Sequence, residues 1–378
     1  MTSASTDVDV LIVGGGPAGS SVAWGLRGQG LRVAVIDKAA FPRNKVCAGW
    51  ITPAVARALR LDLHEYAQGR TLQPINGFLV GMMGAPASEI RYGERPVSYG
   101  IRRCEFDEYL LRRCGAELWL GQPLSRMERQ GDRWLVNDRI RTRLIVGAGG
   151  HFCPVARALG ARLGHCELVV SAQEIEFEMT AEQRSACAVR ADTPELYFCP
   201  DLKGYGWIFR KGDWLNVGLG REDNHRLADH VAQFCEAVRL QGRVGFDLPT
   251  RFHGHAYLLS HRAQRPLTAD GVLLVGDATG LAYPQSGEGI RPAVESGLLA
   301  ARTVLASAGD FSAHRLAGYA ESITRRFGTR QTAAPATTPP HSSRWKQALA
   351  RYALSTRWFN RHIVIDRWFL HRHQPALS

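Results

Sequence analysis

The sequence contains no hydrophobic run of about 18 residues, the length that a membrane-spanning helix requires. Its first nine residues are polar and lack the basic region and the apolar stretch of a secretory signal peptide. None of its eight cysteines forms a CxxC pair, and their wide spacing is not that of a disulfide framework. These absences predict a cytoplasmic protein with reduced thiols and no transmembrane helix.

Motifs for nucleic acids and for metals are also missing. The 47 Lys and Arg against 35 Asp and Glu give a net charge of +12, but the basic residues are dispersed and no nucleic-acid-binding motif accompanies them. We therefore expect no nucleic acid as a partner, and we expect anionic partners such as a diphosphate cofactor, a phosphorylated lipid or an anionic membrane surface. His151, His253, His255 and His261 lack metal-ligand spacing, so no metal site is predicted.

A glycine-rich turn near the N-terminus carries the strongest positive signal. Gly14, Gly16 and Gly19 satisfy the G-x-G-x-x-G pattern between a strand expected at 8–13 and a helix expected at 19–30. The first glycine permits a tight turn, the second lets the backbone approach a pyrophosphate, and the third lets helix and strand pack closely. The helix N-terminus adds free N–H groups and partial positive charge. The turn therefore predicts a dinucleotide-binding site.

The strand after this helix supplies an acidic residue. A strand expected at 31–36 leads to Asp37, which follows Gly19 by 18 residues and is placed to accept hydrogen bonds from ribose hydroxyls. Ala18 and Lys38 complete the cofactor-binding residues predicted in this half of the site. A glycine-rich turn without a ligand is the alternative, but the complete strand–helix–strand context disfavours it.

A second segment with nucleotide-binding character lies far downstream. A strand expected at 271–275 delivers Gly276 and Asp277 to a turn, where the carboxylate can accept a hydrogen bond from a ribityl hydroxyl. Gly287 and Gly289 leave N–H groups free at the start of a helix, and such a helix end can stabilise the anionic edge of a reduced flavin. A ligand-free strand–turn–helix would explain the glycines but not the aspartate. The two segments together predict FAD.

These motifs resemble those of a known flavoprotein superfamily. The motifs similar to those of the p-hydroxybenzoate-hydroxylase-like flavoproteins are Gly14–Gly19, Arg103-x-x-Phe106-Asp107, Gly147–Gly150 and Gly276–Ile290. Within that superfamily, the motifs most similar to those of the geranylgeranyl reductase family are Lys45–Gly49, Tyr205–Phe209 and Pro284–Ile290. Ala48 and Arg210 stand where the reductases usually have Gly and Pro, which leaves the exact substrate open.

The resemblance implies an α/β protein with a discontinuous, FAD-binding Rossmann-like domain, an inserted mixed β-sheet substrate domain and a C-terminal helical tail. The FAD-binding domain would take residues 1–75, 100–165 and 264–329. The remaining parts would be the substrate-binding domain at 76–99 and 166–263, a linker at 330–343 and an amphipathic tail at 344–378. FAD would be bound non-covalently, with Arg103 near its phosphates and Ile290 at the flavin end of the site. For Arg103, a surface helix cap is the alternative.

The same resemblance implies catalytic and substrate-binding residues. Cys47 would donate a proton to one alkene carbon while reduced flavin gives hydride to the other. An inert, buried cysteine is the alternative, and Tyr205 is a second candidate for the proton transfer. Tyr205, Trp207 and Phe209 alternate along the chain, so they share one face of a strand. By the resemblance this face lines a pocket for a long apolar substrate, and an ordinary sheet core is the alternative.

The predicted function is that of an FAD-dependent oxidoreductase that reduces carbon–carbon double bonds of a polyprenyl or other long apolar substrate. An external donor such as NAD(P)H or ferredoxin would reduce the FAD. The first alternative is an FAD-dependent monooxygenase that hydroxylates or epoxidises through a flavin hydroperoxide. The second is a non-catalytic, flavin-stabilised lipid carrier.

The C-terminal tail shows a helical pattern of apolar residues. The residues that follow helical spacing as one stripe are Trp345, Leu349, Tyr352, Phe359, Ile363 and Leu370. Basic residues flank the stripe, a composition that suits a membrane interface. We therefore expect peripheral attachment to the inner face of a membrane, with docking on the protein's own body as the equal alternative.

Overall fold

The computed structural model describes residues 6–161, 167, 169–223, 225–330 and 344–377. The chain forms two compact units, each of which is assembled from separate stretches. Unit 1 comprises residues 1–43, 104–168 and 257–335, and unit 2 comprises residues 44–103, 169–256 and 336–378. Both units mix helices with sheets, as the predicted α/β class requires.

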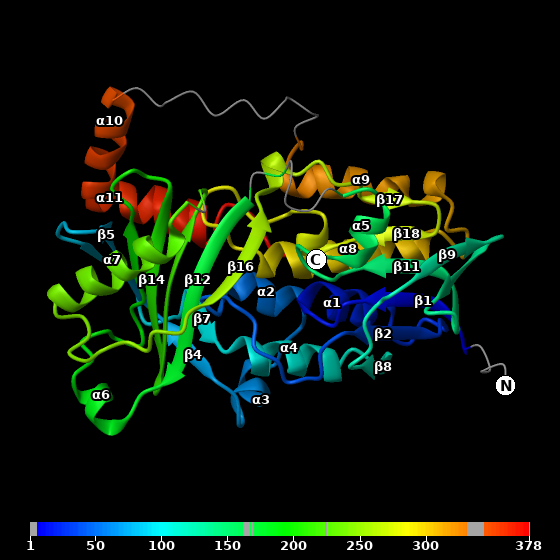
Figure 1. The fold of residues 1–378 in the computed structure, drawn as a ribbon, viewed down its shortest axis with the longest axis horizontal. Coiled ribbons are helices and arrows are strands. Elements are labelled where there is room, and N and C mark those ends of the chain that lie inside the picture. The colour runs from blue at the N-terminus through cyan, green and yellow to red at the C-terminus, as the bar shows by residue number, and fades with distance from the viewer. Residues whose placement is uncertain (1–5, 162–166, 168, 224, 331–343, 378) are drawn as a thin grey trace. The chain divides into compact units, whose positions relative to one another are not determined.

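Unit 1 is built on a largely parallel sheet (Figure 1). Its main strands in spatial order are β17 (Thr268–Ala269), β18 (Val272–Leu274), β11 (Ile140–Gly147), β1 (Thr6–Val13), β2 (Val33–Asp37) and β8 (Glu117–Leu120). The strands from β18 to β8 run parallel, and β17 is antiparallel to β18. The parallel pairing of β1 with β2 around one helix is the βαβ unit that the sequence predicts.

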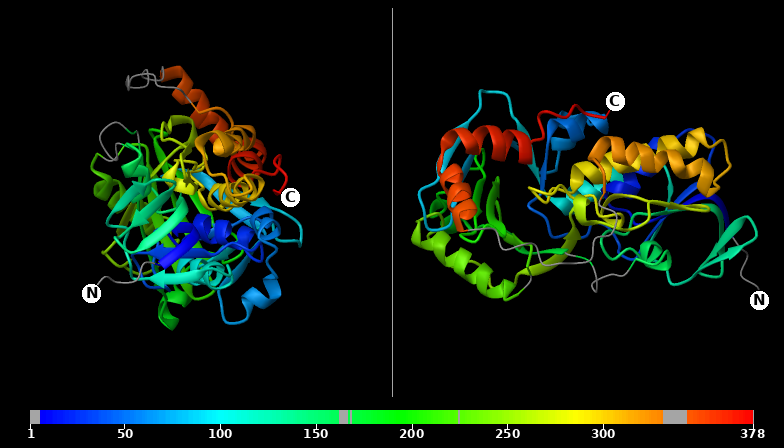
Figure 2. Two further views of the ribbon diagram at one scale, coloured as in Figure 1. Left: turned by 90° about the vertical axis from the view of Figure 1, so that its right-hand side faces the viewer. Right: turned by 90° about the horizontal axis from the view of Figure 1, so that it is seen from above.

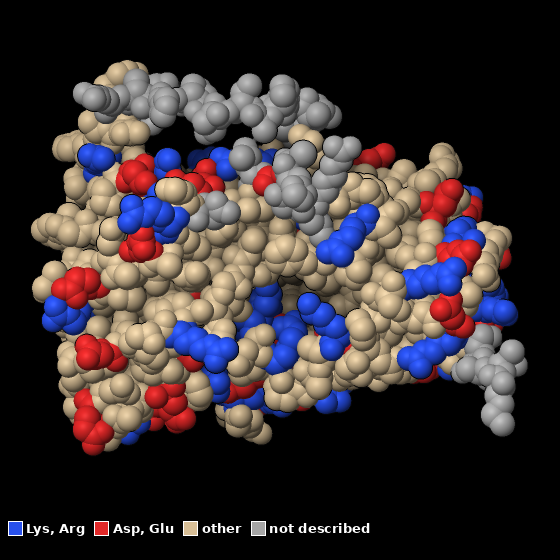
Figure 3. All heavy atoms as spheres, viewed as in Figure 1, with Lys and Arg blue, Asp and Glu red and all other residues tan. Residues whose placement is uncertain are grey.

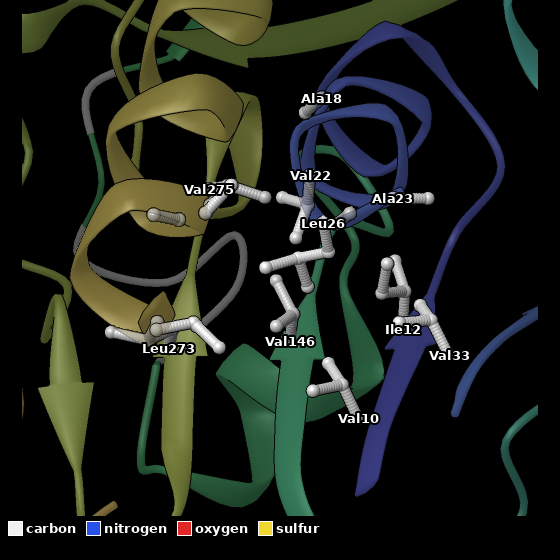
Figure 4. Close-up of a cluster of buried hydrophobic side chains, with 14 of the residues drawn as sticks. Val10, Ile12, Ala18, Val22, Ala23, Leu26, Val33, Val146, Leu273 and Val275 are labelled. Atoms are coloured by element: carbon white, nitrogen blue, oxygen red, sulfur yellow. The ribbon is translucent and has the colours of Figure 1, made fainter. Parts of the chain in front are cut away.

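The inner strands of this sheet are buried on both faces, because apolar side chains of β1 point alternately into two separate clusters. Figure 4 shows Val10, Val146 and Leu273 from three neighbouring strands on the face that meets α1 (Pro17–Leu26). Helix α8 (Ile290–Ala306) packs beside α1. The other helices of unit 1 are α4 (Arg103–Arg112), α5 (Pro154–Ala158), α9 (Ala313–Phe327) and the short turns η1 (Ser260–Arg262) and η2 (Gly276–Ala278).

An antiparallel ribbon of β9 (Met127–Gln130) and β10 (Arg133–Val136) extends from β11. Its charged side chains pair with acidic neighbours: Arg126 lies 3.0 Å from Glu128, and Arg133 lies 3.2 Å from Asp7. On the face drawn in Figure 3, basic and acidic atoms accordingly alternate over this end of unit 1. At this end of the face, basic side chains are paired with carboxylates in exposed ion pairs and form no separate basic patch.

Unit 2 contains two sheets. The strands of the larger sheet in spatial order are β16 (His253–Leu258), β12 (Val169–Glu178), β15 (Trp214–Arg221), β14 (Gly204–Lys211), β13 (Glu195–Phe198), β5 (Gly77–Met82) and β6 (Ser88–Arg91). β13 and β5 run parallel, whereas β12, β15, β14 and β13 pair antiparallel. The sheet is therefore mixed, as predicted. Its helices are α6 (Ala181–Ser185) and α7 (Leu227–Leu240).

The smaller sheet explains why residues 44–75 lie in unit 2 rather than in the predicted N-terminal domain. Its strands are β3 (Trp50–Ile51), β7 (Ser98–Ile101) and β4 (Leu72–Ile75), with α2 (Pro53–Ala58) and α3 (Leu63–Ala67) between β3 and β4. Both β3 and β4 pair with β7, which in turn contacts β14 of the larger sheet. The backbone hydrogen bonds of this stretch are thus made inside unit 2.

The described part of the tail also belongs to unit 2, and the expectation of one continuous stripe is wrong. Its helices are α10 (Arg344–Ser355), α11 (Arg357–Phe359) and η3 (Asn360–Phe369). Thr356 caps the new helix by accepting a hydrogen bond from the Phe359 N–H at 3.4 Å, and α10 and η3 run in different directions (Figures 1 and 2). The η3 end is docked, with Val364 and Phe369 buried, whereas Trp345 on α10 is exposed. Except for Arg330, the predicted linker at 330–343 lies outside the described residues.

Candidate functional site

The predicted phosphate-binding turn connects β1 to α1. Gly14 has a φ of +116°, and a Cβ atom on it would lie 2.4 Å from the carbonyl oxygen of Ala148, so only glycine fits this position. Helix α1 is preceded by Gly16, which has no side chain with which to cap it, and its first turn, which includes Ala18 and Gly19, holds no acidic residue. The positive end of the helix dipole therefore faces no carboxylate of its own first turn, an arrangement that suits an anionic ligand.

Asp37 lies beside this turn, at the end of β2. Its carboxylate accepts hydrogen bonds from the N–H groups of Gly15, at 2.7 Å, and Ala39, at 2.8 Å. The two bonds fix the carboxylate against the glycine turn while it remains partly exposed. The neighbouring Lys38 is exposed. The predicted ribose acceptor and the phosphate-binding turn thus lie together in unit 1.

A basic residue that the sequence analysis missed lies over the same helix end. A guanidinium nitrogen of Arg43 lies 3.3 Å from the place that a Cβ atom on Gly16 would take. Its other nitrogen lies 3.1 Å from a carboxylate oxygen of the fully buried Asp107, which holds the side chain in place. Arg103, which we predicted near the phosphates, is the first residue of α4. The link between Arg43 and Asp107 spans 64 positions, so no local pattern reveals it.

The downstream segment meets the first one inside unit 1. Gly276 has a φ of +59°, and a Cβ atom on it would lie 2.9 Å from the Cβ atom of Ala18 in α1. The Gly276 N–H donates to the Ser296 hydroxyl on α8 at 2.9 Å. The turn that carries Asp277 is therefore packed against both helices. The structure brings together the two segments that the sequence analysis expected to share one cofactor.

A buried arginine fixes the Asp277 turn. Arg265 donates to the carbonyl oxygens of Asp277 and Ala278, at 3.3 and 3.2 Å, and to that of His151 at 2.7 Å. Its charge is balanced by Glu167, whose carboxylate lies 2.7 Å away. Arg265 is only 4% exposed, so this pair is shielded from solvent screening. Sequence reasoning missed Arg265 because it belongs to no motif.

The segment 287–290 leads into α8. The carboxylate of Asp277 lies 3.2 Å from the place that a Cβ atom on Gly289 would take, so the Asp277 side chain and the start of α8 are neighbours. Glu288 accepts a hydrogen bond from the Arg291 N–H at 2.7 Å, and its second oxygen is buried without a hydrogen-bond partner among the described residues. Burial raises the pKa of Glu288 to about 7.

These features fit FAD. A glycine turn with a close backbone approach, an unblocked helix end and a nearby guanidinium match the needs of a diphosphate. Asp37 and Asp277 are acceptors of the kind that ribose and ribityl hydroxyls require. Among the residues that the structure describes, no group of three His, Cys, Asp or Glu side chains is placed to hold a metal ion.

Unit 2 holds the predicted aromatic face on β14. The Tyr205 and Trp207 rings lie 6.0 Å apart, and Phe209 stacks on Trp50 at 5.8 Å. The residue between the first two points the other way, since a Cβ atom on Gly206 would lie 2.6 Å from the ring of Phe234 on α7. The three predicted aromatic residues therefore share one face, as their alternation requires.

Cys47 is joined to this aromatic face by one side chain. The Trp207 indole N–H donates to the Asn216 amide oxygen at 2.7 Å, and the Asn216 amide nitrogen donates to the Cys47 carbonyl at 3.1 Å. Cys47 is partly exposed, and its sulfur accepts a hydrogen bond from the Gly49 N–H at 3.4 Å. Asn216 was not predicted, because an asparagine in a strand carries no distinctive sequence signal.

Comparisons with known proteins also indicate an FAD-dependent oxidoreductase. Residues 9–77 match the family model described as FAD dependent oxidoreductase. The chain is 27% identical over 305 residues to the digeranylgeranylglycerophospholipid reductase of Methanocaldococcus jannaschii, covering 77% of this chain and 75% of that protein. It is 30% identical over 330 residues to the menaquinone reductase of Mycobacterium tuberculosis, covering 79% of this chain and 77% of that protein.

A solved structure supports the fold. The geranylgeranyl bacteriochlorophyll reductase-like protein of Thermoplasma acidophilum superimposes with a TM-score of 0.73 at 21% identity, over 92% of this chain and 88% of that one. This likeness confirms the predicted α/β fold class. Taken with the sequence relatives, it leads to one conclusion: the chain belongs to the geranylgeranyl reductase family of FAD-dependent oxidoreductases.

Proposed function

We propose that the chain reduces carbon–carbon double bonds of a polyprenyl or other long apolar substrate. The observation that carries this proposal is the pair of hydrogen bonds that Asn216 makes to the Trp207 indole and to the Cys47 carbonyl. This Asn216 bridge joins the Cys47 loop, residues 44–50, to the aromatic face. The bridge ties the backbone of Cys47 to a residue of the aromatic face, and protonation of an isolated alkene requires a weak acid beside an apolar wall. Two sequence relatives are named digeranylgeranylglycerophospholipid reductase and menaquinone reductase, and these names support the same reaction class.

Unit 1 would hold FAD non-covalently, and reduced FAD supplies the hydride when bound. The turn from Gly14 to Gly19 and the Arg43 guanidinium would bind its diphosphate. Asp37 and Asp277 would accept hydrogen bonds from its ribose and ribityl hydroxyls, and the N–H group of Gly289 would face its ring system. The expectation that Gly287 also leaves its N–H group free is wrong, because that group donates to the Tyr283 carbonyl oxygen at 2.8 Å.

Unit 2 would bind the substrate and provide the proton. The apolar part of the substrate would contact Tyr205, Trp207 and Phe209. The Cys47 thiol would give its proton to the alkene carbon that does not receive hydride. The resulting thiolate would be reprotonated by water. Tyr205 would remain the alternative donor.

The electron donor and the cellular site complete the proposal. An external reductant, such as NAD(P)H or ferredoxin, would reduce the FAD, because the chain carries a single dinucleotide-binding motif. The exposed apolar residues of α10 would attach a cytoplasmic protein peripherally to the inner face of a membrane, where long prenyl chains reside. Among the described residues, no helix is long and apolar enough to span a membrane.

The test is anaerobic reduction of the FAD-loaded protein, followed by addition of geranylgeranyl diphosphate as the probe and mass measurement of the product. A gain of two hydrogens without oxygen supports the proposal. A gain of one oxygen when air is admitted would instead indicate a monooxygenase, and binding of the probe without either change would indicate a carrier.

Cys47→Ser tests the proton donor, because serine has nearly the same volume but is a far weaker acid. Double-bond reduction should fall by roughly a hundred- to ten-thousand-fold, the range typical for loss of a general acid. FAD retention and flavin reduction should stay near wild type. Cys235→Ser, at a partly exposed thiol on α7, is the matched control and should leave turnover unchanged. Wild-type turnover of Cys47→Ser would assign the proton to Tyr205 or water.

A further inference from the structure

Two buried polar side chains hold the backbone of Cys47. Asn216 on β15 donates to the Cys47 carbonyl at 3.1 Å and to a Glu174 carboxylate oxygen, also at 3.1 Å. The backbone N–H of Cys47 in turn favours the ionised form of the Glu174 carboxyl on β12 and acts to lower its pKa. Asn216 is 1% exposed and Glu174 is 6% exposed. The Cys47 carbonyl is therefore held by Asn216, which is in turn held by Glu174.

The pair sits on a larger charged cluster in the interior of unit 2. Lys211 on β14 is 1% exposed, and its amine lies 2.7 Å from a carboxylate oxygen of Glu176. Arg102 reaches the other Glu176 oxygen at 3.4 Å. Burial acts to raise the pKa of Glu176, but the charge and hydrogen bond of Lys211, the charge of Arg102 and the hydrogen bond from Asn216 together outweigh burial, and the pKa lies below its usual value. Glu176 therefore stays ionised and directly pairs with both cations.

The pKa of Glu174 is shifted in the opposite direction from that of Glu176. It forms no direct ion pair in this cluster, and burial raises its pKa to about 7, although Asn216, Lys211 and the Cys47 N–H oppose that rise. An ionised carboxylate accepts stronger hydrogen bonds than a protonated carboxyl, which also turns one oxygen into a donor. The hydrogen bond from Asn216 and the attraction to the Cys47 N–H therefore strengthen when Glu174 loses its proton.

The backbone of the Cys47 loop packs closely against this charged cluster. A Cβ atom on Gly49 would lie 2.4 Å from the Lys211 amine and 2.2 Å from the Ile101 carbonyl oxygen, so the backbone passes directly over the lysine. On the other side of Cys47, the Lys45 amine lies 2.6 Å from a ring nitrogen of His255. Burying ionisable groups is costly, and an apolar core of the same volume is often as stable. The buried ionisable groups beneath the Cys47 loop therefore indicate a function in holding the loop.

We propose that Glu174 is a positioning residue that, together with Asn216, fixes the Cys47 loop for proton donation and holds it more tightly when its carboxyl is ionised. The inference rests on the proposed function only in assigning the proton to Cys47. The titratable groups that face Glu174 or its partners are Glu176, Lys211, Arg102, Cys47 and the pair of Lys45 with His255. Among these, Glu174 is the carboxyl whose titration falls near neutral pH and changes bonds to the Cys47 backbone.

Hydrogen exchange of the segment 44–50 in the full chain tests the positioning role without any substrate. After correction for the intrinsic pH dependence of exchange, protection of this segment in the wild type should rise about five- to tenfold between pH 6 and pH 8, the difference between a neutral and a charge-assisted hydrogen bond. Glu174→Gln should remove this rise. Glu174→Asp keeps a titratable group on a shorter side chain, so it should retain a pH-dependent rise at lower overall protection, and it serves if the glutamine variant folds poorly.

The single-turnover rate of geranylgeranyl diphosphate reduction by the pre-reduced holoenzyme should follow the same pattern. Its rising limb near neutral pH should flatten in Glu174→Gln, while FAD retention stays at the wild-type level. Glu178→Gln, at an exposed position on the same strand, is the control and should behave as the wild type. An unchanged pH dependence of loop protection in Glu174→Gln would overturn the inference.

The two proposals can fail separately. Loop protection that titrates through Glu174 in a protein that reduces no double bond would refute the proposed function and leave the positioning role standing. Double-bond reduction that depends on Cys47 but is unaffected in Glu174→Gln would refute the positioning role alone.

Discussion

The ring of Phe369 stacks on the indole of Trp50, with 5.6 Å between the ring centroids and 10° between their planes. The same phenylalanine meets Tyr205 edge to face at 5.3 Å. Phe369 ends the η3 helix and is only 2% exposed. A residue near the C-terminus therefore packs against the aromatic face that was predicted to line the substrate pocket. The Tyr92 hydroxyl, which donates to Asp366 at 2.9 Å, holds the same helix in place.

Phe369→Ala should destabilise unit 2 by about 3–5 kcal/mol, because it removes a buried ring and leaves a cavity beside Trp50 and Tyr205. Denaturant-induced unfolding followed by tryptophan fluorescence measures the change. Trp358→Ala is the control, since Trp358 is 65% exposed and its loss should change stability by no more than about 0.5 kcal/mol. Equal stability of the two variants would show that the docked tail does not contribute to folding.

The first helix of the tail should bind anionic membranes. Trp345, Leu349 and Tyr352 lie on one side of α10 at helical spacing and are 64%, 59% and 70% exposed. Changing all three to Ser should lower binding to liposomes of anionic lipid by at least about tenfold, because each side chain contributes on the order of 1 kcal/mol or more when it enters an apolar phase.

Leu240→Ser provides the comparison for this experiment. Leu240 ends α7 in the same unit and is 72% exposed, so it is an equally accessible apolar residue outside the tail. The Leu240→Ser substitution should leave liposome binding at the wild-type level. Binding that is insensitive to the triple change on α10 would remove the membrane-surface hypothesis, and the exposed face would then need another explanation.

Local patterns predicted much of unit 1 correctly. The buried strands β1, β2 and β11 contain apolar runs at 10–13, 33–36 and 144–146. The glycines at the start of α1 mark the turn, because no other residue tolerates the backbone geometry at Gly14. In these elements, the physics that selects the residues acts within a few positions of the chain. Residues 44–75 were predicted to belong to the FAD-binding domain, but they lie in unit 2. Their strands pair with β7, which lies further along the chain.

The residues that the sequence did not reveal act over long separations. Asp107 holds Arg43, and Glu167 balances Arg265, through contacts that no spacing rule anticipates. The tail was misread for another reason. Apolar residues kept helical spacing past residue 355, but Thr356 begins a new helix there. Threonine is a favoured N-cap residue, so Ser355 and Thr356 were the available sign of a break.

Gly16→Ala should weaken FAD binding while leaving the fold intact. The backbone at Gly16 has a φ of −72°, which alanine adopts freely, but the added methyl group would lie 3.3 Å from Arg43 and in the path of the diphosphate. We expect a loss of at least about tenfold in FAD affinity, equivalent to about 1.4 kcal/mol, measured by titration of the apoprotein. The thermal stabilisation produced by added FAD should shrink in parallel.

Gly318→Ala is the matched glycine control. Gly318 lies inside α9, and nothing lies within 4 Å of the place that its Cβ atom would take. The substitution should stabilise the helix by about 1 kcal/mol and leave FAD affinity unchanged. An FAD affinity of Gly16→Ala equal to that of this control would place the diphosphate elsewhere.

Glu288→Gln should change how the stability of the protein depends on pH. The pKa of Glu288 is raised by burial from an ordinary value of 4.5 to about 7, so the folded state binds this proton more tightly than the unfolded state does. The contribution of Glu288 to the free energy of unfolding therefore falls as the pH rises from about 4.5 to about 7 and is constant outside that window. Glutamine keeps the shape but binds no proton, so this fall is absent from the variant.

The quantity to follow is the free energy of unfolding of Glu288→Gln minus that of the wild type, from denaturant titrations of the FAD-free proteins at closely spaced pH values. It should increase steadily between pH 5 and pH 7 and level off above. Contributions from the other titratable groups cancel in the difference, except for Arg291 and Glu295, which couple to Glu288. Arg291 and Glu295 form an ion pair at 2.9 Å in the buried start of α8. A difference that does not vary with pH would mean that Glu288 is ionised in the folded protein throughout, and that its buried oxygen is solvated.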